Sequence, residues 1–240
     1  MIKLFYLLNY GKRMDIEQRL AALKLQIEQA ALRAQRKVDT VHLIAVSKGQ
    51  SAQAIRQAYA AGQRRFAENY LQEALEKISE LTDLKDIEWH YIGRIQSNKT
   101  RLIAENFAWV QSIDRWSIAQ RLNAQRPVHL PPLNICLQLK LDEDEHKGGT
   151  TLALLPKLAE HIIGLPQICF RGLMTIPANS QAEHTQRVFQ RLQQAYAALR
   201  RSGYLLDTLS MGMSADFALA ILAGATQIRI GTALFGARKQ

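Results

Sequence analysis

Cysteine is scarce in this 240-residue sequence, which contains only Cys136 and Cys169. Both lie inside apolar runs, at residues 133–139 and 168–173, so we expect buried free thiols rather than a disulfide framework. Free thiols are typical of a reducing compartment. The scarcity therefore argues against a disulfide-stapled secreted fold and predicts a cytoplasmic protein.

Long hydrophobic segments are also missing, and none approaches the roughly 20 apolar residues of a membrane-spanning helix. Residues 1–8 (MIKLFYLL) are too short for a secretory signal, and no small-residue cleavage site follows them. A clean amphipathic pattern begins at Met14. We therefore interpret residues 1–13 as an N-terminal extension or a misassigned start, and we expect no membrane partner.

Charge of one sign is not concentrated anywhere, although the formal net charge is +10. A basic protein attracts polyanions, so nucleic acid has to be considered. The basic pairs, such as Arg64-Arg65 and Arg200-Arg201, are scattered along the chain. No zinc-finger spacing, aromatic RNA-binding signature or basic zipper is present. The sequence therefore favours a generic basic surface without a specific nucleic-acid partner.

Low-complexity tracts, internal repeats and metal-ligand spacings are absent as well. The charged run at residues 142–146 (DEDEH) is predicted to be a solvated loop rather than a metal site. Hydrophobic residues make up 48% of the chain, which is enough for one large domain with a substantial core.

Short apolar runs alternate with helical patterns along the chain, after a first helix predicted over residues 15–36. Strands that alternate with helices predict a parallel sheet, because parallel neighbours need crossover connections. The predicted strands are residues 42–46, 65–67, 89–92, 109–112, 134–139, 169–173, 208–210 and 227–230. The predicted helices between them are residues 52–61, 71–81, 99–106, 118–123, 152–163, 182–201 and 217–223.

Eight such units in roughly 250 residues is the usual size of a closed (β/α)8 barrel of the TIM type. An open doubly wound sheet is the alternative. It more naturally carries a glycine-rich turn after its first strand, and residues 47–50 (SKGQ) do not form one. We therefore predict an α/β fold in which residues 14–240 form a single barrel domain. The chain ends ten residues beyond the last predicted strand, so no second domain is expected.

In a barrel of this kind, functional groups gather at the carboxyl ends of the strands. Lys48 directly follows the first strand, where partial burial lowers the pKa of an amine and favours a Schiff base with an aldehyde. A solvated loop lysine is the alternative. Asn69 follows the second strand, as a hydrogen-bond donor to a ring hydroxyl or as a cap of the next helix. At the third strand, His90, Gln96 and Asn98 are candidates to line the mouth of the barrel.

The seventh and eighth strands lead into residues 210–214 (SMGMS) and 229–232 (RIGT). Barrels often build a phosphate site from these two loops, with backbone N–H groups at a helix N-terminus. Gly212 and Gly231 let the backbone approach closely, and Ser214 and Thr232 offer hydroxyl donors. Two ordinary turns with helix caps are the alternative.

In this order, the motifs resemble those of the pyridoxal phosphate homeostasis protein family, also called the proline synthetase co-transcribed homologue family. The likeness spans about residues 15–238. Gly49, Ala67 and Arg94 depart from the threonine, glycine and proline that are common in the family. The segments that carry the likeness are residues 43–48 (LIAVSK), 66–73 (FAENYLQE), 89–93 (WHYIG), 96–99 (QSNK), 171–177 (RGLMTIP), 210–214 and 229–232.

The resemblance implies a fold-type III barrel, similar to the N-terminal domain of bacterial alanine racemase, with pyridoxal 5′-phosphate as its cofactor. It implies that Lys48 carries the internal aldimine, that Asn69 lies near the cofactor ring and that Arg229 faces the pyridine nitrogen. The phosphate is then held by Ser214, Gly231 and Thr232, together with Ser210. The full set of implied cofactor-binding residues is Lys48, Asn69, Ser210, Met211, Gly212, Ser214, Arg229, Gly231 and Thr232.

The family is regarded as non-catalytic and as keeping the free cofactor level in balance. An arginine keeps its proton, so Arg229 would leave the pyridine nitrogen unprotonated and the ring a weak electron sink. Racemisation also needs a second base. The resemblance to alanine racemase implies that this base is a tyrosine from a second domain of the partner chain. With no second domain expected, we predict a monomeric, non-catalytic cofactor carrier, with recipient apo-enzymes as further partners. The alternatives are an amino-acid racemase or lyase with the same cofactor and a cofactor-free Schiff-base aldolase.

Overall fold

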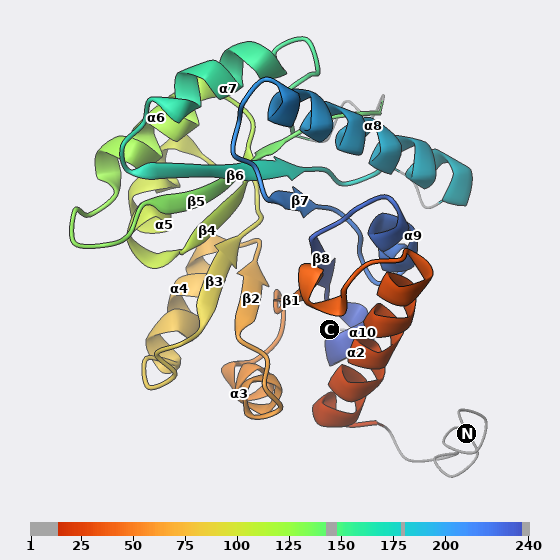
Figure 1. Ribbon diagram of the computed structural model, residues 1–240. Coiled ribbons are helices and arrows are strands. Elements are labelled where there is room, and N and C mark those ends of the chain that lie inside the picture. Colours follow the sequence, from red (N-terminus) through yellow and green to blue (C-terminus); the bar gives the residue numbers. More distant parts are fainter. Residues whose placement is uncertain (1–13, 143–147, 179–180, 237–240) are drawn as a thin grey trace.

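A closed barrel of eight parallel strands forms the centre of the protein, in a computed structural model that describes residues 14–142, 148–178 and 181–236 (Figure 1). The strands are hydrogen-bonded in chain order, and β8 pairs with β1 to close the barrel. The predicted (β/α)8 architecture is confirmed. The strands are β1 (His42–Val46), β2 (Arg65–Glu68), β3 (Glu88–Tyr91), β4 (Trp109–Ile113), β5 (Leu133–Gln138), β6 (Ile168–Met174), β7 (Thr208–Ser210) and β8 (Gln227–Ile230).

Helices connect the strands and lie on the outside of the barrel (Figure 1). The α-helices are α2 (Ile16–Arg33), α3 (Ala52–Ala60), α4 (Leu71–Glu80), α5 (Thr100–Asn106), α6 (Trp116–Gln125), α7 (Leu155–Ile163), α8 (Ala182–Arg201), α9 (Phe217–Leu222) and α10 (Thr232–Phe235). Two short 3-10 helices, η1 (Val38–Thr40) and η2 (Ser97–Lys99), precede β1 and α5.

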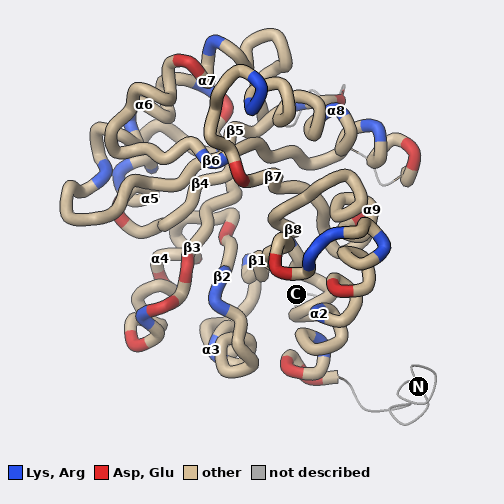
Figure 2. The backbone as a smooth tube through the Cα atoms, viewed as in Figure 1, with Lys and Arg blue, Asp and Glu red and all other residues tan. Residues whose placement is uncertain are grey.

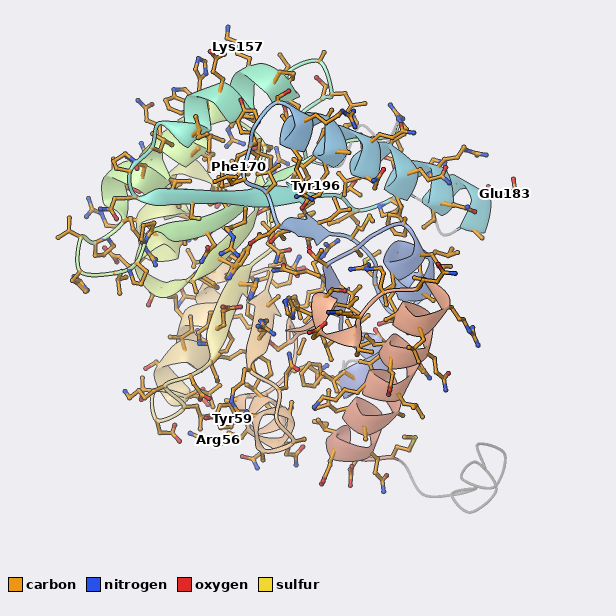
Figure 3. All side chains as sticks on the ribbon, in the orientation of Figure 1. Arg56, Tyr59, Lys157, Phe170, Glu183 and Tyr196 are labelled. Atoms are coloured by element: carbon orange, nitrogen blue, oxygen red, sulfur yellow. The ribbon has the colours of Figure 1, made fainter. Side chains whose placement is uncertain are left out.

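The strands are nearly continuous apolar runs because both of their faces are covered, by the bore on one side and by helices on the other. In β1, four of the five residues are buried, and all five residues of β4 are buried. Two half-buried aromatic side chains, Phe170 of β6 and Tyr196 of α8, pack against this core (Figure 3). The barrel wall is therefore a packed core, and functional groups must lie at its ends or inside its bore.

Close strand approach needs a glycine at one position of the wall. A Cβ atom added at Gly172 of β6 would lie only 1.7 Å from the carbonyl oxygen of Thr208 on β7. The absence of a side chain there allows Gly172 to pair with Thr208. This pairing brings β7, and the loop that follows it, into the wall.

The first helix, α2, packs against α9 and α10 and so covers the last units of the barrel (Figure 1). It begins at a capping box in which the Asp15 carboxylate accepts from the Gln18 N–H and the Gln18 side chain accepts from the Asp15 N–H. Its apolar face buries Leu20, Leu23 and Ile27. Burying such side chains stabilises the fold by roughly 1.5–3 kcal/mol each.

Most element boundaries agree with the sequence within one or two residues, and β1, β7, β8 and α8 match their predicted ranges. The first helix ends at Arg33 rather than at residue 36, because Gln35 has a φ of 54°, which no α-helix accommodates. Helix α7 begins at Leu155 rather than at residue 152, with a proline in its first turn. The four-residue helix α10 was not predicted.

The two cysteines are free, but only Cys136 is buried, and Cys169 is half-buried. The prediction of two buried thiols was therefore wrong for Cys169. Of the charged run at 142–146, residues 143–146 lie outside the described residues, as does the segment 1–13. Elsewhere in the described chain, no three His, Cys, Asp or Glu side chains are grouped as metal ligands would be.

Basic and acidic residues are interspersed over the helices and loops in the view of Figure 2. This agrees with the expectation that the basic residues are scattered along the chain. Among the described residues, no helix is both long enough and apolar enough to cross a membrane.

Candidate functional site

Lys48 lies two residues beyond the end of β1, at the carboxyl end of the barrel. Its side chain is half-buried, and the preceding Ser47 is fully buried. The lysine side chain is therefore partly covered at the edge of the barrel. Of the two alternatives drawn from the sequence, the structure favours the partly buried lysine.

A buried ion-pair cluster holds the backbone on both sides of this lysine. The Nζ atom of Lys77 on α4 donates to the carbonyl oxygen of Ser47 at 2.7 Å, to Oε1 of Glu68 at 2.8 Å and to Oε1 of Glu73 at 2.6 Å. The Ser47 hydroxyl donates to Glu68 at 2.6 Å, and the Gly49 N–H donates to Glu73 at 2.5 Å. We call these five residues the lysine clamp.

The electrostatics of the lysine clamp centre on Glu68, which is completely buried at the end of β2. Burial raises the pKa of Glu68, and the hydrogen bond and charge of Lys77 only partly oppose this effect. Its second oxygen, Oε2, has no hydrogen-bond partner among the described residues. The Glu68–Lys77 ion pair is therefore held by the short distances within the clamp and not by a surplus of positive charge.

Asn69 follows β2 and is half-buried, with its Oδ1 atom buried and without a hydrogen-bond partner among the described residues. The N-cap of α4 is Tyr70, and no side chain caps this helix. The capping alternative for Asn69 is therefore not observed. A buried amide oxygen without a partner is costly, and a ligand that supplies a donor would relieve the cost.

Arg229 points into the barrel from β8 and is only 3% exposed. Its Nη1 atom donates to Oγ of Ser210 at 2.6 Å, and Nη2 donates to the carbonyl oxygen of Thr175 at 2.8 Å. Burial lowers the pKa of Arg229 to about 10, so the side chain remains a cation at neutral pH. No described residue accepts a hydrogen bond from its Nε atom.

The segments after β7 and β8 are joined by a hydrogen bond from the Ala233 N–H, in the first turn of α10, to Oγ of Ser214 at 3.3 Å. Ser214 does not cap α9, whose N-cap is Asp216. The hydroxyl proton of Ser214 and the exposed hydroxyl of Thr232 form no other hydrogen bond within the described chain. Two hydroxyl donors are thus available at adjoining loops.

Glycine is required at position 212, and it allows a close backbone approach at position 231. Gly212 has a φ of 95°, and a Cβ atom there would lie 2.5 Å from the Cβ of Ala220. At Gly231, a Cβ atom would lie 3.3 Å from the carbonyl oxygen of Val46, two residues before Lys48. The eighth loop is therefore packed directly against the end of β1.

The other predicted site residues are placed as follows. Met211 lies in the loop after β7, and its side chain is fully buried in the core. His90 is not at the mouth but inside the barrel, where both of its ring nitrogens have partners. Gln96 and Asn98 are exposed in and next to η2.

Several polar residues that the structure brings together were not predicted from the sequence, above all Lys77 of the lysine clamp and Gln111 inside the bore. The available signal was a polar residue inside an apolar strand, as with Gln111 in β4. For Lys77, the only signal was its position on the apolar face of α4. Neither pattern names a partner, because the partners lie on other strands.

A cavity of about 790 Å³ lies elsewhere, between α2 and the amino-terminal ends of β1 and β2. Two of its carboxylates are already paired, Asp86 with Arg64 and Glu88 with Arg65. Functional groups of such barrels gather at the opposite, carboxyl end. We therefore locate the candidate site by the convergence of functional groups at Lys48 and not by cavity volume.

A family model described as the alanine racemase N-terminal domain matches residues 19–239. A pyridoxal phosphate homeostasis protein from Pseudomonas aeruginosa is 53% identical over 226 residues, which cover 93% of this chain and 96% of the relative. The chain belongs to the pyridoxal phosphate homeostasis protein family. The resemblance stated from the sequence motifs is thereby confirmed.

Solved structures agree with this family assignment. PipY of Synechococcus elongatus PCC7942, a structure with PLP bound, is 43% identical and aligns with a TM-score of 0.81 over 92% of this chain and 100% of PipY. Alanine racemase from Corynebacterium glutamicum aligns with a TM-score of 0.67 at 18% identity, over 92% of this chain but 62% of the racemase. The racemase shares the fold, and at this identity the comparison shows the fold alone.

Proposed function

We propose that this protein binds pyridoxal 5′-phosphate covalently on Lys48 and helps to keep the free cofactor in balance without catalytic turnover. The observation that carries the proposal is a half-buried lysine beside a two-loop set of free hydroxyl donors in a family whose member PipY has PLP bound. When bound, pyridoxal phosphate supplies an aldehyde that condenses reversibly with amines.

The donor chemistry of the chain fits this cofactor. Gly231 lies against the end of β1, so the eighth loop adjoins the strand that carries Lys48. Ser214 and Thr232 retain hydroxyl protons for a phosphate, and the half-buried Gly231 leaves its backbone accessible. We assign the phosphate to Ser214, Gly231 and Thr232, with Gly212 shaping the loop.

The ring of the cofactor needs partners of a different kind. Arg229 is a buried cation whose Nε–H has no acceptor in the described chain, and this donor suits a pyridine nitrogen. The orphan Oδ1 atom of Asn69 needs a donor, and the amide that carries it can itself donate to the ring hydroxyl. Ser210 is engaged with Arg229, so we assign it to holding that side chain rather than to the phosphate.

The chain's own residues therefore bind, orient and release the cofactor. The half-buried position of Lys48 leaves its amine within reach of competing amines, as a carrier requires. The name of the Pseudomonas relative describes homeostasis, and the match extends over nearly its whole length. These observations support the non-catalytic role. As further parts of the same proposal, the carrier is monomeric and passes the cofactor to recipient apo-enzymes.

The decisive experiment is the near-visible absorption spectrum of the purified protein after incubation with pyridoxal phosphate. We expect a yellow protein whose absorption is bleached by borohydride, with the reduced adduct mapped to Lys48. Lys48→Ala should remain colourless. Lys140→Ala is the matched control, because Lys140 also lies two residues past a strand, β5, and is half-buried. It should bind the cofactor as the wild type does.

A protein that stays colourless at saturating cofactor would overturn the proposal. Formation of D-alanine from L-alanine that depends on Lys48 would overturn the non-catalytic part of it. Trapping of a sugar phosphate on Lys48 in the absence of cofactor would point to an aldolase instead.

A further inference from the structure

A continuous chain of polar side chains crosses the bore of the barrel, centred on Gln111 of β4. Its Oε1 atom accepts from Oγ of Ser210 at 2.7 Å, and its Nε2 atom donates to Oε1 of Gln227 at 2.7 Å and to Nδ1 of His90 at 2.9 Å. All four side chains are at most 4% exposed. A buried network of this kind offsets the free-energy cost of removing its polar groups from water only when every member is hydrogen-bonded.

The two ends of this bore network are charged. At the carboxyl end of the barrel, Nη1 of Arg229 donates to Oγ of Ser210 at 2.6 Å. Toward the amino-terminal end, Nε2 of His90 lies 2.9 Å from Oε1 of Glu88, which also accepts from Nε of Arg65 at 3.2 Å. The network therefore links a buried cation at the proposed site to a carboxylate at the other end of the barrel.

Every hydrogen bond along this path points in the same direction. An arginine can only donate, so the Ser210 oxygen accepts from Arg229 and its single proton goes to Oε1 of Gln111. The Gln111 amide is thereby oriented with its NH₂ group toward His90. Nδ1 of His90 must accept, so its proton is on Nε2 and is donated to the Glu88 carboxylate. Burial lowers the pKa of His90, which agrees with this neutral ring.

We propose that Gln111 and His90 are positioning residues that hold Arg229 with its Nε–H directed at the ring nitrogen of the bound cofactor. The inference rests on the proposed function, because it assigns a role toward pyridoxal phosphate. Nη1 and Nη2 are held by Ser210 and by the Thr175 carbonyl, which leaves Nε as the guanidinium nitrogen without a partner in the described chain. A donor held in advance binds more tightly than one that must be ordered by the ligand.

The test compares two ligands: pyridoxal phosphate and its carbocyclic analogue, in which C–H replaces the ring nitrogen. Gln111→Leu removes the acceptor of Ser210 and both donors. We expect it to weaken pyridoxal phosphate binding by at least about tenfold, the size of one hydrogen bond to a charged group. The affinity of the variant for the analogue should stay within about twofold of the wild-type value, because the analogue has no ring nitrogen to accept a hydrogen bond from Nε of Arg229.

Two further variants make the comparison robust. Gln111→Glu keeps the shape and the acceptor for Ser210 but turns an oxygen toward Gln227 and His90, so it should show the same ligand-dependent loss even where the leucine variant does not fold. Gln63→Leu is the matched control. Gln63 is also a buried glutamine with two bonds from Nε2, to the carbonyl oxygens of Leu43 and Arg65, but lies outside the network. It should not change the preference between the ligands.

Equal weakening of both ligands by the Gln111 variants, or no weakening of either, would overturn the positioning role. A wild-type protein that fails to form the Lys48 adduct would instead overturn the proposed function itself. The two failures are distinguishable, because the first requires a wild type that binds.

Discussion

At the scale of single residues, the site consists of groups whose local surroundings leave at least one hydrogen-bonding capacity unused. Asn69 has an amide oxygen without a partner, and Arg229 has a free Nε–H within the described chain. Ser214 accepts from Ala233 and keeps its own proton. Each group is ordinary alone, and their occurrence at one end of the barrel is what distinguishes them from loop residues.

Removal of either phosphate hydroxyl should weaken cofactor retention. Ser214→Ala and Thr232→Ala each remove one hydrogen bond to a charged group, worth about 1.5–3 kcal/mol, so cofactor release should be roughly ten to a hundred times faster. The release rate can be followed by dilution of the loaded protein into an excess of a competing amine. Ser117→Ala, at an exposed position on α6, is the control. Unchanged release from both loop variants would refute the assignment.

Lys48 and the two loop motifs could be found from the sequence because each directly follows an apolar strand. Ser210 could be found but not given its role, because the motif does not show that its hydroxyl faces Arg229. Asn69 had two interpretations, and the absence of a side-chain cap on α4 separates them.

At the scale of elements, the lysine clamp connects α4 to the ends of β1 and β2. Lys77 contributes three hydrogen bonds to this connection and is 5% exposed. Lys77 bonds the backbone of Ser47, and Glu73 bonds the backbone of Gly49, so the clamp reaches both neighbours of Lys48. The helix and the proposed cofactor lysine are therefore positioned together.

Loss of the clamp lysine should cost stability. Lys77→Met leaves the buried Glu68 carboxylate unpaired, which costs about 3–5 kcal/mol. The double variant Lys77→Met with Glu68→Gln should recover part of this loss, because the uncompensated charge is gone. Urea unfolding of the apo-protein measures both. Lys24→Met, at an exposed position of α2, should change stability by less than about 0.5 kcal/mol. Equal stability of Lys77→Met and the wild type would contradict this reading of the clamp.

The alternating strands and helices were largely predictable, since buried parallel strands are nearly continuous apolar runs. The clamp was not predictable, because Glu68, Glu73 and Lys77 look like solvated charges of a helix and its entrance. Only the barrel geometry turns them inward, beneath the loop after β1.

At the scale of the whole molecule, the two ends of the barrel are connected through its bore. Burial by itself would raise the pKa of Glu88, but the hydrogen bond from the neutral His90 and the charge of Arg65 lower it overall. Glu88 is thus a stable anionic end for the bore network. The neutral His90 next to it is fully buried.

This arrangement predicts a dependence of stability on pH. Burial lowers the pKa of His90, so the unfolded chain takes up a proton below about pH 6.5 while the folded protein does not. Stability is therefore complete above about pH 6.5 and falls as the pH decreases toward the lowered folded-state pKa, by up to about 1.4 kcal/mol per pH unit for this group. Urea titrations between pH 7.5 and 5 measure the slope.

His90→Gln should flatten this profile, although it lowers the overall stability. The half-buried His42, whose pKa is also lowered by burial and by Arg65, should contribute a smaller part of the slope. His129→Gln, at an exposed position, serves as the control and should keep the wild-type profile. If His90→Gln retains the wild-type slope, the buried ring is not the source of the dependence.

The sequence by itself determined the parallel barrel, the lysine after its first strand and the family, because these depend on apolar periodicity and on motifs that are contiguous in the chain. Only the tertiary structure decided that Glu68 and Lys77 support Lys48, and that Gln111 and His90 connect Arg229 to Glu88. The physical reason is that a buried polar group is defined by its partner. In this closed barrel, the side-chain partners Gln111 and Gln227 come from strands that place them 116 residues apart in the chain.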